Sequence, residues 1–257
     1  MARTGKLVFN KRRLRGFTGN QLKLIACFCM LCDHIGYVLI ENGVLYGQNV
    51  QYWEMALATG AGQRWYLLAR VLRTIGRLAF PIFAYLLVEG FLHTHDLRKY
   101  MRNIGLCALV SEVPFDLACF HMVYYPYYQN VCVTLFLGLL SMYLMKKANR
   151  LPLLQLLLAG AVSALAWFVR CDYGAVGVGL ISVLWLLRKD TSAQLVIGAA
   201  IAAIESFGYY CSAALAFLPI RFYNGKRGTA PLKYFFYLFY PLHLLLFWLL
   251  VYVGNRG

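Results

Sequence analysis

Two adjacent ionisable side chains, Asp33 and His34, lie inside the otherwise apolar run of residues 24–40. That run is just long enough to cross a lipid bilayer. A charged side chain at such depth costs roughly 2.5–3.5 kcal/mol on insertion scales, so it normally faces a bundle interior or a wet cavity. Because an imidazole can take up and release a proton near neutral pH, the pair predicts proton-transfer chemistry inside a membrane.

Further polar side chains fall at a similar depth in other apolar runs. With a rise of about 1.5 Å per residue, counted from the cytoplasmic end of each expected helix, all of them lie roughly 14–24 Å into the membrane. They are Asp33, His34, Arg77, Glu112, Asp116, Glu205 and His243. Unrelated polar residues would not be expected to share one depth, so we predict that these groups meet around one cavity.

Neighbouring residues on a helix point about 100° apart, so Asp33 and His34 cannot simply pair with each other. We expect Asp33 to meet Arg77, and His34 to take a carboxylate partner from the helix of Glu112 or from that of Glu205. The alternative is that each charge belongs to an ion pair that only fixes helix packing.

A second polar group follows the second expected helix. Glu89 and His93 are four residues apart, so the acid can hold the imidazole in one tautomer. The basic residues after them could hold phosphates, although a positively charged cytoplasmic turn explains them equally well. This group contains Arg98, Lys99, Tyr100 and Arg102. Tyr240 and His243 form a third polar insertion, in the last apolar run.

The composition indicates that membrane helices must position these groups. The chain has 257 residues, of which 61% are hydrophobic and 14% charged, and its mean hydropathy is +0.61. We therefore predict an all-α polytopic membrane protein with one domain over residues 1–257, including a basic cytoplasmic leader at 1–20. About nine transmembrane helices fit, with eight or ten as alternatives: 21–42, 75–93, 100–119, 130–146, 151–169, 173–188, 193–205, 207–221 and 234–253.

The net charge of +15 follows from topology, because lysines and arginines cluster in alternate connections, as the positive-inside rule requires for a cytoplasmic N-terminus. We therefore expect a lipid bilayer and no nucleic acid as partner. Arg70, Arg73 and Arg77 share a face of an expected helix over 64–77, which we interpret as an interfacial helix with its arginines at lipid headgroups. The eight cysteines lie mostly in apolar runs, so no disulfide framework and no metal are expected.

These stretches together resemble the TraX family of conjugal pilin acetylases. The residues that carry the resemblance are those of 22–36, 76–90 and 111–116, with His93, Thr94, Tyr100 and Arg102. The first helix is also similar to that of the wider membrane acyltransferases, in which a basic residue precedes a histidine of the same helix by about ten residues. Lys23 and His34 take those places here.

The resemblance implies an enzyme of the bacterial cytoplasmic membrane. It would transfer an acyl group, with acetyl from acetyl-CoA as the expected case, to an amine or hydroxyl of an acceptor. The acceptor would be membrane-associated or external, such as a pilin-like peptide, a lipid or a glycan. His34 would be the general base, oriented by Glu112 or Asp116 and accompanied by Asp33, and Arg77 would stabilise the oxyanion or hold the acceptor.

The same resemblance implies one site for the acyl donor and another for the acyl acceptor. The donor site for the CoA phosphates and pantetheine would contain His93, Arg98, Lys99, Tyr100 and Arg102, and the acceptor site would contain Glu89, Glu205, Tyr240 and His243. Two alternatives remain open: a proton-coupled small-molecule transporter, which also needs charges at mid-membrane, and a non-catalytic membrane assembly protein.

Overall fold

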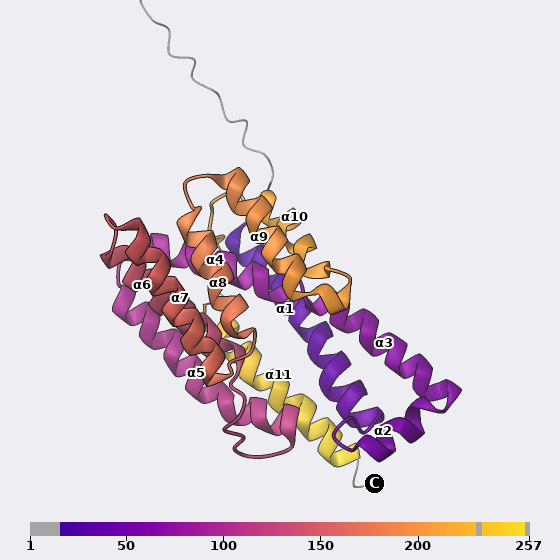
Figure 1. Ribbon diagram of the computed structural model, residues 1–257. Coiled ribbons are helices and arrows are strands. Elements are labelled where there is room, and N and C mark those ends of the chain that lie inside the picture. The colour runs from indigo at the N-terminus through magenta and orange to yellow at the C-terminus, as the bar shows by residue number, and fades with distance from the viewer. Residues whose placement is uncertain (1–15, 230–232, 255–257) are drawn as a thin grey trace, which may run out of the picture.

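The computed structural model describes residues 16–229 and 233–254, and the regular secondary structure in these ranges is helical (Figure 1). Most of the expected leader lies outside the described residues. The elements are α1 (Gly19–His34), η1 (Ile35–Val44), α2 (Val50–Leu57), α3 (Gly60–Gly76), α4 (Ala79–His93), α5 (Leu97–Phe120), α6 (Val131–Lys147), α7 (Pro152–Val169), α8 (Gly174–Leu186), α9 (Thr191–Glu205), η2 (Phe207–Tyr209), η3 (Ser212–Ala216), α10 (Phe217–Arg221) and α11 (Lys233–Gly254).

The prediction of an all-helical protein is confirmed over the described residues, and the apolar helices suggest a membrane protein. Five helical segments of the described ranges are long and apolar enough to cross a bilayer: Gly19–Val44, Gly60–His93, Leu97–Phe120, Pro152–Val169 and Tyr234–Gly254. Shorter apolar helices cover Gly174–Leu186, Thr191–Glu205 and Ser212–Arg221. Large apolar side chains such as Phe28, Leu109 and Phe168 are more than half exposed, as expected where lipid covers the protein.

The single helix expected over residues 207–221 is wrong. The structure has two short 3-10 helices and one turn of α-helix there, because Tyr210 and Cys211 both adopt the left-handed conformation with φ of 56°. A left-handed residue ends a right-handed helix. The count of nine transmembrane helices and the cytoplasmic N-terminus stay predictions.

The first long helix changes its winding directly after His34. At its start, Thr18 and Gln21 form a capping box in which each side chain accepts a hydrogen bond from the other residue's backbone. From Ile35 to Val44 the helix continues as η1, a π-helix. Such wide turns are rare and occur often at functional sites.

The arginine-bearing helix α3 lies against the first helix rather than at lipid headgroups. Only 16% of the Arg73 side chain and 13% of the Arg77 side chain are exposed, and both guanidinium groups turn toward α1 and η1. The expectation of an interfacial arginine stripe is therefore wrong. The physical reason is that Asp33 and Glu41, on α1 and η1, offer carboxylates to these arginines in place of the phosphates of lipid headgroups.

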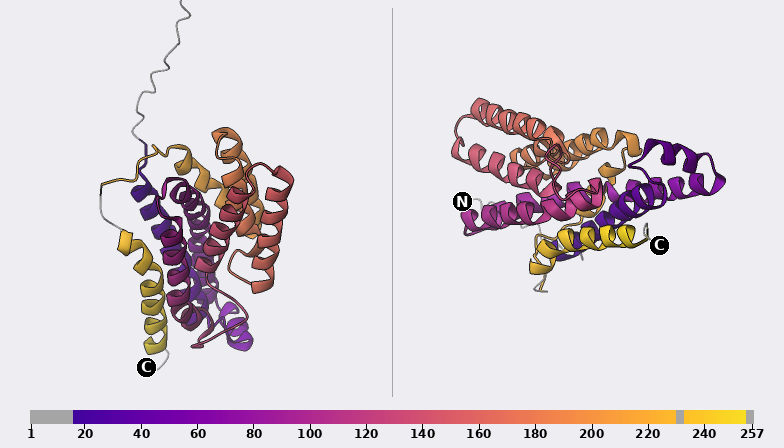
Figure 2. Two further views of the ribbon diagram at one scale, coloured as in Figure 1. Left: turned by 90° about the vertical axis from the view of Figure 1, so that its left-hand side faces the viewer. Right: turned by 90° about the horizontal axis from the view of Figure 1, so that it is seen from below.

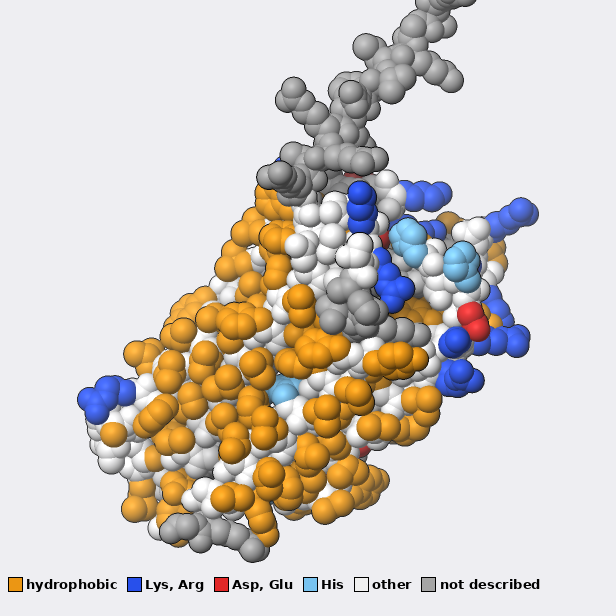
Figure 3. Space-filling model, turned by 180° about the vertical axis from the view of Figure 1, so that it is seen from behind, with side chains coloured by type: hydrophobic (Ala, Val, Ile, Leu, Met, Phe, Trp, Pro, Cys, Tyr) orange, Lys and Arg blue, Asp and Glu red, His pale blue; other side chains and the backbone are white. Residues whose placement is uncertain are grey.

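The helices form a bundle whose two ends differ in charge. Helix α11 runs along one side of the bundle, next to α5 and η1 (Figure 2). One buried apolar cluster joins α4, α6 and α8, and another joins η1, α5 and α11. Figure 3 shows lysines and arginines gathered toward one end of the molecule, with apolar side chains over most of the face below. The connections α4–α5, α6–α7 and α8–α9 share this basic end with the start of α1 (Figure 1).

Candidate functional site

A cavity of about 680 Å³, here called the central cavity, runs between α1, α4, α5 and α11. Its mouth is at the basic end, where the exposed residues His93, His95 and Lys99 line it. Its deep end is lined by Asp33 and His34. The volume is in the range of small-molecule sites. The two polar groups expected from the sequence therefore open onto one continuous space.

At the deep end Asp33 forms the ion pair expected from its depth. The Nη2 of Arg77 donates a hydrogen bond of 2.6 Å to Asp33 Oδ1, and Arg73 Nε lies 3.8 Å from the same oxygen. Asp33 lines the central cavity, whereas Arg77 does not. Gly76 makes the approach possible, because a Cβ there would lie 2.3 Å from the Asp33 Cβ.

His34 pairs with a second histidine instead of the expected carboxylate. Its Nδ1 lies 2.6 Å from Nε2 of His243 on α11, and the two rings are stacked with centroids 4.8 Å apart. On its far side His243 Nδ1 lies 2.5 Å from the backbone oxygen of Phe239. Only His34 of this pair lines the cavity, and His243, 7% exposed, lies behind it. Tyr240 lines the cavity beside them, with its ring centroid 5.8 Å from that of His34.

The carboxylates of α5 do not reach His34. Glu112 accepts hydrogen bonds from both the backbone and the side-chain amide of Asn130, the N-cap of α6. Asp116 accepts one of 2.8 Å from the backbone N–H of Tyr125. Both acids therefore hold the connection between α5 and α6. Their spacing of four does place them on one face of α5, but that face turns toward this connection and not toward α1.

A cluster around α3 was only partly expected. Arg73 Nη1 donates a hydrogen bond of 2.7 Å to Glu41 Oε2, and its guanidinium lies 4.6 Å from the ring centroid of Tyr37. The ring centroid of Tyr209, in η2, lies 5.5 Å from the guanidinium carbon of Arg73 and 5.1 Å from that of Arg77. Glu41 lies within the first expected helix, 21–42, one residue beyond the apolar run, but α-helical spacing could not place it beside Asp33 because the segment between them becomes a π-helix.

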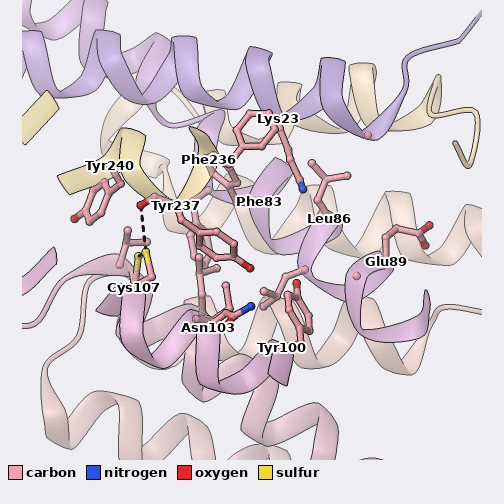
Figure 4. Close-up of a pocket in the computed structure, with 18 of the residues that line it drawn as sticks. Lys23, Phe83, Leu86, Glu89, Tyr100, Asn103, Cys107, Phe236, Tyr237 and Tyr240 are labelled. Atoms are coloured by element: carbon pink, nitrogen blue, oxygen red, sulfur yellow. Dashed lines mark hydrogen bonds between the residues drawn. The ribbon is translucent and has the colours of Figure 1, made fainter. Parts of the chain in front are cut away.

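The middle of the cavity carries side chains that the sequence analysis left out of the site. Figure 4 shows Lys23 from α1, Asn103 and Cys107 from α5, and Tyr237 from α11 around this space. Lys23 Nζ lies 5.1 Å from the ring centroid of Phe236. The signal for the α5 residues was their spacing of three and seven from Tyr100, which places all of them on one helix face.

Only some of the residues expected to bind CoA line the central cavity at its mouth. Lys99 and Tyr100 line the central cavity, whereas Arg98 lines a smaller hollow beside His95, and the exposed Arg102 lines neither. The imidazole of His93 is held by the Glu89 backbone oxygen at 2.8 Å from Nδ1, closer than the Glu89 carboxylate at 3.9 Å.

Two further acids lie near the deep end. Asp172, in the connection between α7 and α8, lines the cavity and accepts a hydrogen bond from the Tyr128 hydroxyl at 3.2 Å. Burial raises the pKa of the Asp172 carboxyl, and the positive charge of Arg77 opposes that shift. Glu205, at the end of α9, does not line the cavity. Asp172 was missed because the expected sixth helix began at 173, so residue 172 fell into an external loop.

The comparison with protein families identifies the chain. The family model of the TraX protein matches residues 18–251, nearly the whole length described here. The chain belongs to the TraX family. It is also 28% identical over 255 residues, 90% of this chain and 94% of the relative, to the probable fimbrial assembly protein FimC, serogroup H1, of Dichelobacter nodosus. No solved structure matches the chain.

The match to the TraX family covers every polar group described above. The resemblance drawn from residues 22–36, 76–90 and 111–116 is thereby confirmed at the level of the family. Two of these stretches meet in space, because Asp33 and His34 come from the first and Arg77 from the second. The third stretch, with Glu112 and Asp116, holds the α5–α6 connection instead.

Proposed function

We propose that this TraX family protein is a membrane acyltransferase. It transfers an acyl group, acetyl in the simplest case, from acyl-CoA to an amine or hydroxyl of a membrane-associated acceptor. The observation that carries the proposal is the central cavity itself, which joins an exposed basic mouth to an imidazole deep in the bundle. A donor that enters from one side of the membrane and a reaction within the bundle both need such a passage.

The basic side chains of the cavity lining suit the charged part of CoA. Lys23, Lys99 and Arg227 all line the cavity, and lysine and arginine are common ligands of phosphate groups. From Lys23 to His34 the helical rise corresponds to about 16 Å. Tyr100 and Asn103 line the intervening wall and offer hydrogen-bonding groups to the amides of a pantetheine arm.

The reaction at the deep end needs one base. His34 takes the proton of the acceptor amine or hydroxyl as the freed lone pair attacks the thioester carbonyl carbon. The resulting tetrahedral intermediate collapses, the carbon–sulfur bond breaks, and the departing CoA thiolate receives the proton held by His34. The products are the acylated acceptor and free CoA, and no other reactant is required.

Asp33 and Arg77 support this site as positioning residues. The Asp33 carboxylate lines the cavity directly beside His34, and the 2.6 Å bond from Arg77 fixes it there. A direct oxyanion role for Arg77, which the family resemblance implies, requires its guanidinium to reach the cavity, which it does not line. The observed geometry favours a role in holding the carboxylate and the facing helices α1 and α3.

The printed name of one relative supports the choice of acceptor, and the basic end of the bundle supports the choice of membrane. The relative from Dichelobacter nodosus is named a probable fimbrial assembly protein, which favours a pilin-type acceptor over a free metabolite. The basic end of the bundle would face the cytoplasm by the positive-inside rule, in the bacterial cytoplasmic membrane. The donor then enters from the compartment that contains CoA.

A non-catalytic assembly role is the second candidate, because the printed name of the relative refers to assembly and to no reaction. In that case the central cavity would receive part of the partner and His34 would be a structural residue. A variant without the His34 imidazole would then still support fimbrial assembly and partner binding.

The experiment uses the purified full chain in lipid nanodiscs with labelled acetyl-CoA and three acceptors: a pilin-type peptide, membrane lipid and a small amine. His34→Ala is compared with His93→Ala and with His121→Asn as a matched control. His121 is exposed, lies outside the cavity lining, and has φ of 56°, which Asn tolerates.

The proposal expects transfer by wild type and His121→Asn, and a loss of about 10²-fold or more for His34→Ala. A loss only in His93→Ala would move the base to the mouth of the cavity. No transfer to any acceptor by wild type, with intact fimbrial assembly in His34→Ala cells, would overturn the enzyme and favour the assembly role.

A further inference from the structure

The contact between His34 and His243 fixes where every proton of the pair must be. Three polar atoms in a row follow His34 Nδ1: His243 Nε2 at 2.6 Å, His243 Nδ1 on the same ring, and the Phe239 carbonyl oxygen at 2.5 Å. The other ring nitrogen of His34, Nε2, has no hydrogen-bond partner among the described residues, and His34 lines the central cavity.

The assignment starts at the carbonyl. A carbonyl oxygen can only accept a hydrogen bond, so His243 Nδ1 must carry the proton that it donates to Phe239. In a neutral imidazole the other nitrogen is then a bare acceptor, so His243 Nε2 accepts. His34 Nδ1 must therefore carry a proton and donate it, which leaves His34 Nε2 with a free lone pair.

A protonated His243 would reverse this order, but its surroundings oppose the charge. Its side chain is surrounded by the rings of His34, Phe239, Tyr240 and Phe247. No carboxylate lies within 4.0 Å of it among the residues that the structure describes. An uncompensated cation in such surroundings is strongly disfavoured.

The carboxylate nearest to His34 along the chain cannot take over the task of His243. Asp33 points about 100° away on the helix. Its Oδ1 is bonded to Arg77 at 2.6 Å. His243 is thus the group that sets the state of the His34 ring.

We propose that His243 is a positioning residue that holds His34 in the Nδ1–H tautomer, with the Nε2 lone pair directed to the central cavity. This assignment deepens the proposed function, and its catalytic part rests on it. When Nε2 accepts a proton, the bond from His34 Nδ1 to His243 becomes charge-assisted and therefore stronger.

The same geometry prevents a proton from passing from His34 through His243 to another group. His243 could receive a proton at Nε2 but has nowhere to pass it on, since its second nitrogen faces a backbone carbonyl. The proton must leave from the His34 nitrogen that received it. That requirement matches a group transfer, in which the leaving group recovers the proton at the same place, and does not match a relay across the membrane.

The test reads the tautomer directly and needs no substrate. Full-length protein with ¹⁵N-labelled histidine in lipid bilayers is studied by solid-state NMR, and each signal of interest is assigned by its loss in His34→Ala or His243→Leu. We expect both His34 and His243 to show a protonated Nδ1 and a bare Nε2, whereas free histidine favours Nε2–H. In His243→Leu the His34 signals should shift from the Nδ1–H form toward the Nε2–H form that free histidine favours.

Transfer assays on the same variants test the consequence. His243→Gln keeps an acceptor oxygen near the former Nε2 and should retain activity within about tenfold of wild type, whereas His243→Leu should lose about 10²-fold or more, toward the level of His34→Ala. His121→Asn again serves as the folded control.

The assignment is overturned if His34 Nε2 is protonated in the wild-type protein, or if a folded His243→Leu variant transfers at the wild-type rate. Failure of the proposed function looks different. The two histidines would then show the expected nitrogen signals while the wild-type protein transferred no acyl group to any acceptor.

Discussion

Replacing Gly76 by alanine tests the contact that brings α3 to α1. The new Cβ would lie 2.3 Å from Asp33 Cβ and 2.6 Å from Asp33 Oδ1. An ordinary carbon–carbon contact is about 3.5–4.0 Å, so the two helices would have to separate by about 1.2 Å or more. The obstacle is the backbone-proximal part of Asp33, which cannot rotate away as the tip of a long side chain could.

The cost can be estimated from three terms. Overpacking costs about 1–3 kcal/mol. Weakening the hydrogen bond between Arg77 and the Asp33 carboxylate costs about 1.5–3 kcal/mol more. The better helix propensity of alanine offsets up to about 1 kcal/mol. We expect a net loss of about 3 kcal/mol, which lowers the melting temperature by roughly 6–12 °C for a chain of this size.

The assay is thermal unfolding of purified protein in nanodiscs at one scan rate, followed by acetyl transfer at a temperature where the variant is folded. Gly179→Ala is the matched control, because a Cβ at this helical glycine of α8 meets nothing within 4 Å. The reasoning is refuted if Gly76→Ala melts at the same temperature as Gly179→Ala.

Three other outcomes follow from the polar contacts. Arg77→Leu leaves the buried Asp33 carboxylate without its main partner and should cost about 3–5 kcal/mol, part of which Asp33→Asn should restore in the double variant; equal melting of single and double variants would contradict the pair. The Sγ atoms of Cys107 and Cys132 are 3.6 Å apart, so mild oxidation should join them, and mass spectrometry should find the loss of two hydrogens; two persistent free thiols would show that α5 and α6 are not so placed. Glu112→Ala should destabilise the protein by about 1–3 kcal/mol and spare acyl transfer, because this residue holds the α5–α6 connection and does not line the cavity; loss of transfer in the folded variant would contradict that.

The sequence was sufficient to predict an all-helical chain and one of the contacts between its polar groups. Depth arithmetic paired Asp33 with Arg77 correctly, although Arg77 is the C-cap residue of α3 and lies in the turn before α4. It could not give the rotation of each helix about its own axis. Glu112 agreed with His34 in depth, yet its face turns toward Asn130 and away from α1.

The His34 partner was missed for a second reason. His243 was placed about 5 Å too shallow, because the count assumed that all helices begin in one plane and stand upright. Its helix, α11, follows a connection whose length does not show where the helix enters the bundle. Periodicity within one helix carries no information on this offset between helices.

The arginine face of α3 shows how a correct pattern can be misinterpreted. The shared face of Arg70, Arg73 and Arg77 is real, but periodicity alone cannot distinguish lipid headgroups from carboxylates as their partners. Glu41, which could have decided the question, lies beyond the point where the first helix becomes a π-helix. Its direction therefore could not be computed from 3.6 residues per turn.

The change from α-helix to π-helix after His34 divides the first membrane segment into two parts that differ in how well they accommodate an insertion or a deletion. From Lys23 to His34 the chain is a regular α-helix, so any insertion or deletion there would rotate the imidazole away from its place by about 100°. From Ile35 to Val44 the wider turns already accommodate extra backbone. Removing one residue there would be accommodated by a return to ordinary α-helical pitch, which leaves His34 in place and shifts the contacts that η1 makes with Arg73. Changes in segment length, such as those that adapt a protein to a thinner or thicker bilayer, are therefore accommodated beyond the histidine and excluded before it.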